Sequence, residues 1–345
     1  MASVSFLPLG AIIQTIKVDG INIVQGFDNP EQYQQHNHPY FGETIGRVAN
    51  RIKDATITNL NGQSYSLAQN NGPNNLHGGN VGWGKKLWTE IECPIAREVP
   101  GIEGLTAAKT TAYGLASKDG DEGFPGTVQA TVFYTAGLQK INGRHVTVLA
   151  MEYEAELTGG AKETVINMTN HSYFNLNAAP TIEGTRVALA TDQYLPVDET
   201  GIPTSGPTTF PGIAAGVEFT LDAEDPDIDD CFVIDPTAAS TVPIDTRDGP
   251  LRLNLAASHP VSGIHLEVLS TEPSFQFYTG KYIDVPAVGG LSKRGRRSGF
   301  CCEPGRYVNA VNNKAWKPQV LLKRGQTYGA RIVYKAWKER EAVDS

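Results

Sequence analysis

Cysteine and long apolar runs are scarce in this sequence, and each scarcity excludes a class of protein. Four cysteines in 345 residues, two of them adjacent at Cys301 and Cys302, do not make the framework of a disulfide-rich secreted domain, so we expect a reducing compartment. No run of about 18 apolar residues occurs, and Pro8, Lys17 and Asp19 interrupt the start of the chain, so we expect neither a membrane span nor a signal peptide. These features predict a cytoplasmic protein.

Positive charge is also in short supply. The formal net charge is -8 at pH 7 and the sequence pI is about 5.4. Nucleic acids and anionic membrane surfaces are bound through basic patches, so neither is the expected main partner. The composition favours a small, neutral substrate.

Helical periodicity is scarce as well, and short alternating runs separated by Gly, Pro, Asn and Asp clusters take its place. The clearest run is 146–157, in which Leu149, Met151 and Tyr153 alternate with glutamates, as in a half-buried strand. Similar runs occur at 128–134, 264–269, 275–279 and 328–334. The pattern predicts an all-β protein of packed sheets, organised as a single domain over residues 1–345 with a polar tail at 335–345.

The segment 164–176, with the sequence TVINMTNHSYFNL, holds the most informative strand pattern. With the two-residue period of a strand, one face carries four apolar side chains and the other carries polar ones. The apolar face is Ile166, Met168, Phe174 and Leu176, and the polar face is Asn167, Thr169, His171, Tyr173 and Asn175. A face with donors, acceptors and one group that titrates near neutrality suits a ligand rich in hydroxyls, although a histidine satisfied on a solvated face is the simpler alternative.

Two further segments carry planar donors. Arginines flank Ala49 and Asn50 in 46–52 (GRVANRI), and His77 precedes two glycines in 70–79 (NNGPNNLHGG). Such groups can bind sugar hydroxyls, and they can equally form a structural arginine network beside a glycine turn.

Nucleotide and metal sites are poorly supported. The segment 79–86 approaches a phosphate-binding loop, but Lys86 replaces the Ser or Thr that holds magnesium, and no helical pattern follows. The acidic segment 225–234 lacks the ligand alternation of a calcium loop, and His36 and His38 share a loop by spacing alone. We expect no metal, and we expect one carboxylate of Asp229 or Asp230 to accept hydrogen bonds from vicinal hydroxyls, with a solvated acidic turn as the alternative.

Glu303 lies in the segment 299–312, where it shares a strand face with Cys301 and is followed by Pro304, which we expect to end the strand. A glutamate on a mostly apolar strand is desolvated, which raises its pKa and strengthens it as a base. A cysteine nucleophile at Cys301 or Cys302 is an alternative, but neither has an evident activating partner in the sequence. The basic loop 293–297 is expected to be solvated.

These motifs and their order along the chain resemble those of the aldose 1-epimerases, the galactose mutarotase family. The motifs are GRxANRI, LHGG, NHSYFNL, IDDCF, QFYTG and GFCCEP, and the resemblance covers about residues 9–334. The histidine strand and the glutamate strand are the most specific of them.

The resemblance implies a large antiparallel β-supersandwich that interconverts the α and β anomers of a free aldose, such as galactose or glucose, without cofactor or metal. Carried over by position, His171 resembles the general acid and Glu303 the general base. The residues that resemble the hydroxyl-binding set are Arg51, His77 and Asp229, with Gln276 and Tyr173 as neighbours. The expected partner is a monosaccharide, and the expected state is a monomer or weak homodimer.

Departures from the family pattern bear on substrate preference. Gly305 and Arg306 follow the glutamate where an amide is frequent, and Asn309 replaces a frequent aspartate. Two alternative functions remain open. A hexose-6-phosphate 1-epimerase would need an arginine cluster at the pocket, for which Arg306 and the loop 293–297 are the candidates. A non-catalytic sugar-binding module would bind sugar without accelerating mutarotation.

Overall fold

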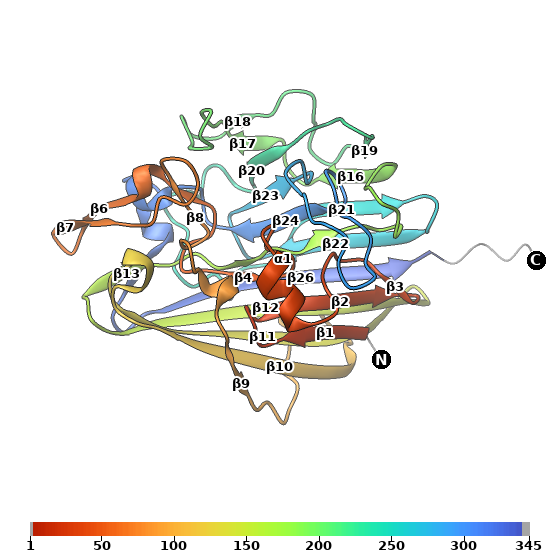
Figure 1. Cartoon of the computed structure of the whole chain (residues 1–345), viewed down its shortest axis with the longest axis horizontal. Helices are drawn as coiled ribbons and strands as arrows, with labels where there is room; N and C mark the ends of the chain where they lie inside the picture. The colour runs from red at the N-terminus through yellow and green to blue at the C-terminus, as the bar shows by residue number, and fades with distance from the viewer. Residues whose placement is uncertain (1–2, 340–345) are drawn as a thin grey trace, which may run out of the picture.

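The computed structural model describes residues 3–339, and strands dominate that part of the chain (Figure 1). Its one α-helix is α1 (Pro30–His36), where Asn29 caps the N-terminus through Oδ1, which accepts from the backbone N–H of Gln32 at 3.0 Å. Short 3-10 turns lie at η1 (Lys53–Ala55), η2 (Trp83–Lys85), η3 (Asp121–Gly123), η4 (Ala310–Asn312) and η5 (Lys317–Gln319). No helix among residues 3–339 has the length and apolar character needed to cross a membrane.

The largest sheet has nine antiparallel strands, and the long strands β10, β11 and β12 form the lower side of the molecule in Figure 1. In spatial order the strands are β19 (Phe219–Leu221), β16 (Thr185–Leu189), β21 (Arg252–His259), β22 (Ile264–Ser270), β26 (Thr327–Lys338), β12 (Arg144–Gly159), β11 (Thr127–Ile141), β10 (Thr106–Ser117) and β9 (Thr89–Ile91).

A second sheet of six antiparallel strands carries most of the motifs IDDCF, QFYTG and GFCCEP and part of NHSYFNL. In spatial order its strands are β15 (Tyr173–Phe174), β24 (Phe300–Gly305), β23 (Ser274–Tyr278), β20 (Asp229–Val233), β17 (Gln193–Leu195) and β18 (Thr208–Thr209). Strands β20, β23 and β17 lie on the upper side of Figure 1.

Smaller sheets complete the fold. They are β1 (Ser3–Leu7) with β2 (Ile12–Val18) and β3 (Ile21–Asn22), β13 (Glu163–Val165) with β25 (Leu321–Lys323), β14 (Thr169–Asn170) with β4 (Thr44–Ile45), β5 (Arg51–Ile52) with β8 (Asn75–Leu76), and β6 (Thr56–Leu60) with β7 (Gln63–Ser66).

The main core lies between the two large sheets. Its buried residues come from the nine-stranded sheet, such as Tyr153 and Ile332, and from the six-stranded sheet, such as Phe275 and Phe300. The apolar face predicted for 146–157 is confirmed, because Leu149, Met151, Tyr153, Ala155 and Leu157 all belong to this core. Two sheets whose apolar faces meet in this way form a β-sandwich, as the sequence predicts. The strand is not half buried as predicted, because residues 146–153 are buried on both faces: Val146, Val148 and Ala150 belong to a separate core cluster, and Glu152 is 5% exposed.

Four further expectations need correction. The basic loop 293–297 is not wholly solvated, because Arg294 and Arg297 are buried. The polar tail does not begin at residue 335, because β26 continues to Lys338 and pairs there with Ile264; residues 340–345 lie outside the described part of the chain. Pro304 does not end its strand, because it pairs with Phe275 inside β24. The segment 164–176 is not one continuous strand, since it divides into parts of β13, β14 and β15. Its polar face is buried, which contradicts the alternative of a histidine on a solvated face.

Candidate active site

The register of the six-stranded sheet places the polar side chains of four strands in two rows on one face. One row pairs Cys231 with Gln276 and Gln276 with Glu303. The other joins Asp229, Tyr278, Cys301 and Tyr173 in the same way. Directly opposed residues in an antiparallel sheet point to the same face, so these side chains converge although they lie far apart in the sequence.

The opposite face of these strands explains why the polar rows face away from the core. Except at Asp230, the polar residues alternate with apolar ones, and the apolar set belongs to the main core: Phe174, Phe232, Phe275, Phe277, Phe300 and Cys302. A shift of one residue in register would bury the polar side chains in that core. The aromatic residues therefore hold the register that aims Glu303 at the site. The sequence prediction that Glu303 and Cys301 face away from Phe300 and Cys302 is confirmed.

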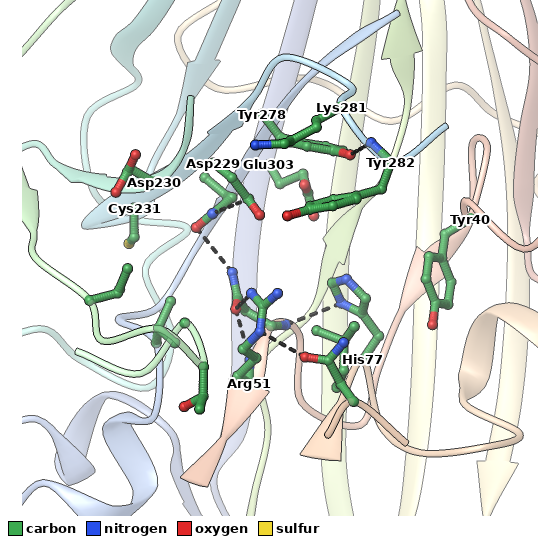
Figure 2. Close-up of a pocket in the computed structure, with 18 of the residues that line it drawn as sticks. Tyr40, Arg51, His77, Asp229, Asp230, Cys231, Tyr278, Lys281, Tyr282 and Glu303 are labelled. Atoms are coloured by element: carbon green, nitrogen blue, oxygen red, sulfur yellow. Dashed lines mark hydrogen bonds between the residues drawn. The ribbon is translucent and has the colours of Figure 1, made fainter. Parts of the chain in front are cut away.

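A cavity of about 790 Å³ covers the polar face (Figure 2). The seven residues predicted from the sequence all line it: Arg51, His77, His171, Tyr173, Asp229, Gln276 and Glu303. They come from the six-stranded sheet, from the β5–β8 pair, and from the connection between β14 and β15.

His171 and Glu303 lie beside each other in the lining of the cavity. The imidazole Nε2 lies 3.5 Å from Glu303 Oε1, and both side chains are about 5% exposed. Burial lowers the pKa of His171 to about 3 and raises the pKa of Glu303 well above its usual value, with the charge of Asp229 adding to the rise. The predicted desolvation of Glu303 is thus confirmed. The protonated His171 expected for a general acid is not the favoured form before substrate binds.

The backbone around His171 is held by the segment that precedes β4. The N–H of His171 donates to the carbonyl of Glu43 at 2.9 Å, and its own carbonyl accepts from the N–H of Gly42 at 3.0 Å. On the side-chain level, the rings of Tyr40 and Tyr173 stack on the imidazole at centroid distances of 5.6 and 5.0 Å. The ring of His171 is therefore held by two aromatic contacts as well as by its backbone, with Nε2 directed at Glu303.

His77 lies at 5.1 Å from His171, measured between ring centroids, and is held in one orientation. The pairing of β5 with β8 places it beside Asn50, whose backbone N–H donates to His77 Nδ1 at 3.2 Å. Burial and the positive charges of Arg51 and Lys85 lower its pKa, so the ring is neutral. Since Nδ1 accepts, the ring proton lies on Nε2, where it can donate to a ligand.

A chain of hydrogen bonds connects the carboxylate of Asp229 to Asn50. Gln276 Nε2 donates to Asp229 Oδ1 at 2.8 Å, and Asn50 Nδ2 donates to Gln276 Oε1 at 3.0 Å. Arg51 is held by Asn71, whose Oδ1 accepts from the guanidinium Nε at 3.0 Å, and this leaves further N–H groups of the arginine available to a ligand. Such a ring of fixed donors and acceptors suits a polyhydroxylated molecule.

Metal binding is the alternative use of this cluster. One ligand atom each of His77, His171 and Glu303 lies within 4.8 Å of the others. The Nδ1 of His77 accepts from Asn50, however, and its Nε2 carries the proton, so neither nitrogen offers a free lone pair to a cation. The arrangement fits hydrogen bonding to hydroxyl groups better than metal ligation.

Several residues of the cavity were not selected from the sequence. Asn50 and Tyr40 both adopt left-handed backbone conformations, with φ of 60° and 68°; Asn50 contacts His77, and Tyr40 contacts both histidines. Asn50 lies inside the GRVANRI motif, and asparagine adopts this conformation more readily than most residues, so its place in the motif was a usable signal. Tyr278 also had a signal, because it shares a strand face with Gln276 in the predicted strand 275–279. No comparable signal marks Tyr40.

The rival residues lie outside the cavity or are unreactive. Arg306, proposed for a phosphate group, is buried, with Nε 2.8 Å from Glu272 Oε2 and side-chain nitrogens that donate to three backbone carbonyls. None of residues 293–297 lines the cavity either, so the arginine cluster needed for a phosphosugar is absent from it. The thiols of Cys301 and Cys302 have pKa values raised well above normal by burial, which disfavours the thiolate of a nucleophile.

The two other departures from the expected motif also lie behind the cavity. Gly305 packs against Asn167, where a Cβ would come 3.1 Å from Oδ1, and the backbone N–H of Asn309 donates to the carbonyl of Arg51 at 3.1 Å. These residues support the site without lining the cavity.

Comparison with known proteins assigns the chain to a family. The family model for aldose 1-epimerase matches residues 1–335. The galactose mutarotase of Sus scrofa is 36% identical over 324 residues, which are 89% of this chain and 81% of that protein. The structure of the GalM/aldose epimerase homologue from C. elegans superposes with a TM-score of 0.80 at 25% identity, covering 98% of this chain and 96% of the other.

Some relatives are longer. The bifunctional protein gal10 of Schizosaccharomyces pombe is 36% identical over 345 residues, which are 97% of this chain but 44% of that protein. This chain thus spans about half the length of that relative. The match of the family model, the sandwich fold and the mutarotase relatives agree: the chain belongs to the aldose 1-epimerase family.

Proposed function

We propose that the chain is an aldose 1-epimerase that interconverts the α and β anomers of a free aldose, galactose or glucose. The observation that carries the proposal is the pair of His171 and Glu303, both buried and both lining the cavity, with 3.5 Å between Nε2 and Oε1. A base and an acid at this spacing can act on two oxygens bonded to the same carbon. The anomeric carbon of a sugar has this arrangement.

The mechanism assigns one proton transfer to each group. Glu303, as the carboxylate, removes the proton from the hydroxyl on C1, while His171 delivers a proton to the ring oxygen. The C1–O5 bond breaks, and the open-chain aldehyde forms. Rotation about the C1–C2 bond exposes the other face of the carbonyl, and ring closure with the two groups in reversed roles yields the opposite anomer.

The protonation of the pair depends on the substrate. Before binding, burial favours neutral His171 and protonated Glu303, so the pair holds one proton. A bound sugar donates hydrogen bonds to the carboxylate, which lowers the pKa of Glu303 beyond the effect that the charge of Arg51 already has before binding. These hydrogen bonds favour the form in which His171 carries the proton, which is the reactive form.

The charges of the cavity support an unphosphorylated substrate. Its lysine and arginine side chains are Arg51 and Lys281, while its acidic side chains are Asp198, Glu199, Asp227, Asp229, Asp230, Asp284 and Glu303. A phosphate group would meet repulsion from these carboxylates. Neutral hydroxyls can use Asp229, Gln276 and Arg51 as acceptors and donors.

The proposal also covers the domain organisation, the location and the oligomeric state of the chain. We propose one domain over residues 1–345, since the main core draws on residues from Ala11 to Ala336. The four cysteines, Cys93, Cys231, Cys301 and Cys302, are unpaired, which agrees with a cytoplasmic location. We also propose a monomer or weak homodimer.

Polarimetry of freshly dissolved α-D-galactose and α-D-glucose tests the proposal. The protein should accelerate the approach to anomeric equilibrium above the spontaneous rate, and glucose 6-phosphate should compete poorly. Sugar binding without acceleration would support the non-catalytic module, and faster turnover of the phosphosugar would support the hexose-6-phosphate 1-epimerase.

A further inference from the structure

The two ring nitrogens of His171 face two side chains of the same strand. Nε2 lies 3.5 Å from Glu303 Oε1, and Nδ1 lies 3.5 Å from Cys301 Sγ. Cys301 and Glu303 are two residues apart in β24, so both side chains point to the same face of the sheet. The proposed mechanism uses the contact at Nε2 and leaves the contact at Nδ1 without a role.

The contact between Nδ1 and the thiol is closed to solvent. Cys301 is 0% exposed and His171 is 4% exposed. Cys301 pairs directly with Tyr173 of β15, and the ring of Tyr173 stacks on the imidazole, so the register of the sheet fixes the thiol beside the ring. A buried ring nitrogen needs a hydrogen-bond partner within the protein, and at Nδ1 that partner is the thiol of Cys301.

The protonation of the site gives this hydrogen bond its direction. Burial raises the pKa of Glu303 well above normal, while burial and the charge of Lys85 lower the pKa of His171 to about 3. At neutral pH the site therefore holds a carboxylic acid beside a neutral imidazole, and His77, the other ring in contact, is also neutral. The O–H of the acid is a donor, so Nε2 faces it with a lone pair. The ring proton of His171 then lies on Nδ1, which donates to Cys301 Sγ.

A thiol suits this acceptor position. Burial raises the pKa of the Cys301 thiol well above normal, so the sulfur is uncharged and accepts only a weak hydrogen bond. A carboxylate in its place would stabilise the imidazolium and make His171 a weaker acid. The uncharged sulfur orients the ring without holding the second proton, which His171 has to deliver to the sugar.

The proposed reaction needs the ring proton on Nδ1. One proton moves between Nε2 of His171 and the ring oxygen of the sugar, so Nδ1 has to keep its own proton throughout the cycle. We propose that Cys301 is a positioning residue that holds the ring proton of neutral His171 on Nδ1 and so reserves Nε2 for proton transfer. The inference rests on the proposed function and adds to it the residue that selects the tautomer of the acid.

Nuclear magnetic resonance tests the tautomer without requiring turnover. The full chain is labelled with isotope-enriched histidine and studied at neutral pH, because nitrogen chemical shifts separate a protonated ring nitrogen from one with a free lone pair. The spectrum of His171→Asn identifies the signals of His171 among those of the seven histidines. We expect a protonated Nδ1 in the wild type and in Cys301→Ser, whose hydroxyl can also accept, and a larger share of protonated Nε2 in Cys301→Ala.

Polarimetry with α-D-galactose measures the consequence for the reaction. Cys301→Ala should lower kcat by about 10-fold and leave KM within about twofold, because a buried N–H loses its partner while the hydroxyl-binding residues are unchanged. Cys301→Ser should restore kcat to within about threefold of the wild type, since the hydroxyl replaces the acceptor.

Cys302→Ala is the matched control for packing. It removes a thiol of the same size from the neighbouring position of β24, where Cys302 is 0% exposed and belongs to the main core on the opposite face. This variant should lower the melting temperature as Cys301→Ala does, and it should keep the wild-type kcat and the wild-type tautomer of His171. The melting temperature and far-ultraviolet circular dichroism establish that each variant is folded.

Three results would overturn the role of Cys301 while leaving the proposed function intact. They are a wild-type spectrum with the ring proton on Nε2, a folded Cys301→Ala with the wild-type kcat, and a loss of kcat in Cys302→Ala equal to that in Cys301→Ala. The opposite combination is also distinguishable. A wild type that accelerates no sugar, but whose Nδ1 proton is lost in Cys301→Ala and kept in Cys301→Ser, would overturn the proposed function and support the contact that selects the tautomer.

Discussion

Replacing Glu303 by glutamine removes the proposed base and changes little else in the structure. The side chain is about 6% exposed and lies 3.5 Å from His171 Nε2, and glutamine has nearly the same volume and shape. Because burial already favours the uncharged carboxylic acid before substrate binds, the neutral amide should be tolerated at this position. The substitution therefore separates the chemistry of Glu303 from its packing.

The expected loss of turnover follows from general base catalysis. A positioned acid or base contributes about 100- to 10,000-fold, which corresponds to about 2.7–5.4 kcal/mol in activation free energy. The substrate hydroxyls still have Asp229, Gln276, Arg51 and His77 as partners. We therefore expect Glu303→Gln to lower kcat by at least about 100-fold while KM changes by less than about 10-fold.

The assay is the optical rotation of freshly dissolved α-D-galactose, corrected for spontaneous mutarotation at the same pH and temperature. Glu218→Gln is the matched control, because the Glu218 side chain is 56% exposed and its contact with Arg186 is 3.8 Å long. The control should retain the wild-type rate. Thermal unfolding of both variants should lie close to that of the wild type.

The reasoning is refuted if folded Glu303→Gln retains most of the wild-type kcat. In that case the base is another group, and Asp229 is the nearest remaining carboxylate in the hydrogen-bonded chain of the cavity. A loss of the fold in Glu303→Gln would contradict the claim that burial favours the neutral form of this side chain.

The other predictions concern the acid, the hydroxyl-binding chain, the pH profile and the buried ion pair. His171→Asn should lower kcat by at least about 100-fold in the same polarimetric assay. Gln276→Ala should raise KM for galactose by about 10-fold, with a smaller effect on kcat, because it breaks the connection between two hydroxyl-binding residues. Activity should be constant while the pair of His171 and Glu303 holds one proton; it should fall below the pKa of His171, about 3, where the pair gains a second proton, and above the raised pKa of Glu303, where the pair loses its proton. Arg306→Ala should lower the free energy of unfolding by about 3–5 kcal/mol in urea denaturation, because it leaves the fully buried carboxylate of Glu272 without its partner.

Each of these has an outcome that contradicts it. His171→Asn with near-normal turnover would remove the acid role, and a loss in kcat alone for Gln276→Ala would place Gln276 in the chemistry instead of in binding. An acid limb near pH 6.5 would show that burial does not lower the pKa of His171 in the working enzyme. Normal stability of Arg306→Ala, combined with an altered turnover of phosphorylated sugars, would support the alternative function of a hexose-6-phosphate 1-epimerase.

Much of the fold was accessible from local patterns. The alternation in 146–157 and the apolar positions Ile166, Met168, Phe174 and Leu176 identify buried faces correctly, because side chains in a strand alternate whatever the strand pairs with. The failures occur where tertiary contacts decide. Proline 304 stays within β24 because its neighbours in the sheet hold it there, and the segment 164–176 breaks into short pieces that pair with different partners.

The site shows the same division. The chemical identities of His171 and Glu303, and the motifs that contain them, were readable in the chain, because each motif is local. Tyr40, which stacks on His171, was not identified, since a tyrosine in a polar loop has no sequence pattern that tells whether it faces solvent or a cavity. Its role depends on a turn whose direction is set by packing against other segments.

The sequence by itself determined the strand faces, the acidic and cysteine-poor character, and the residues with acid, base and hydroxyl-binding chemistry. The tertiary structure decided that these residues meet. The pairing of β20, β23, β24 and β15 brings Asp229, Gln276, Glu303 and Tyr173 to one face, and burial there moves the pKa values of His171 and Glu303 in opposite directions. Register and desolvation are properties of the assembled sheets, because both depend on neighbours that are distant in the sequence.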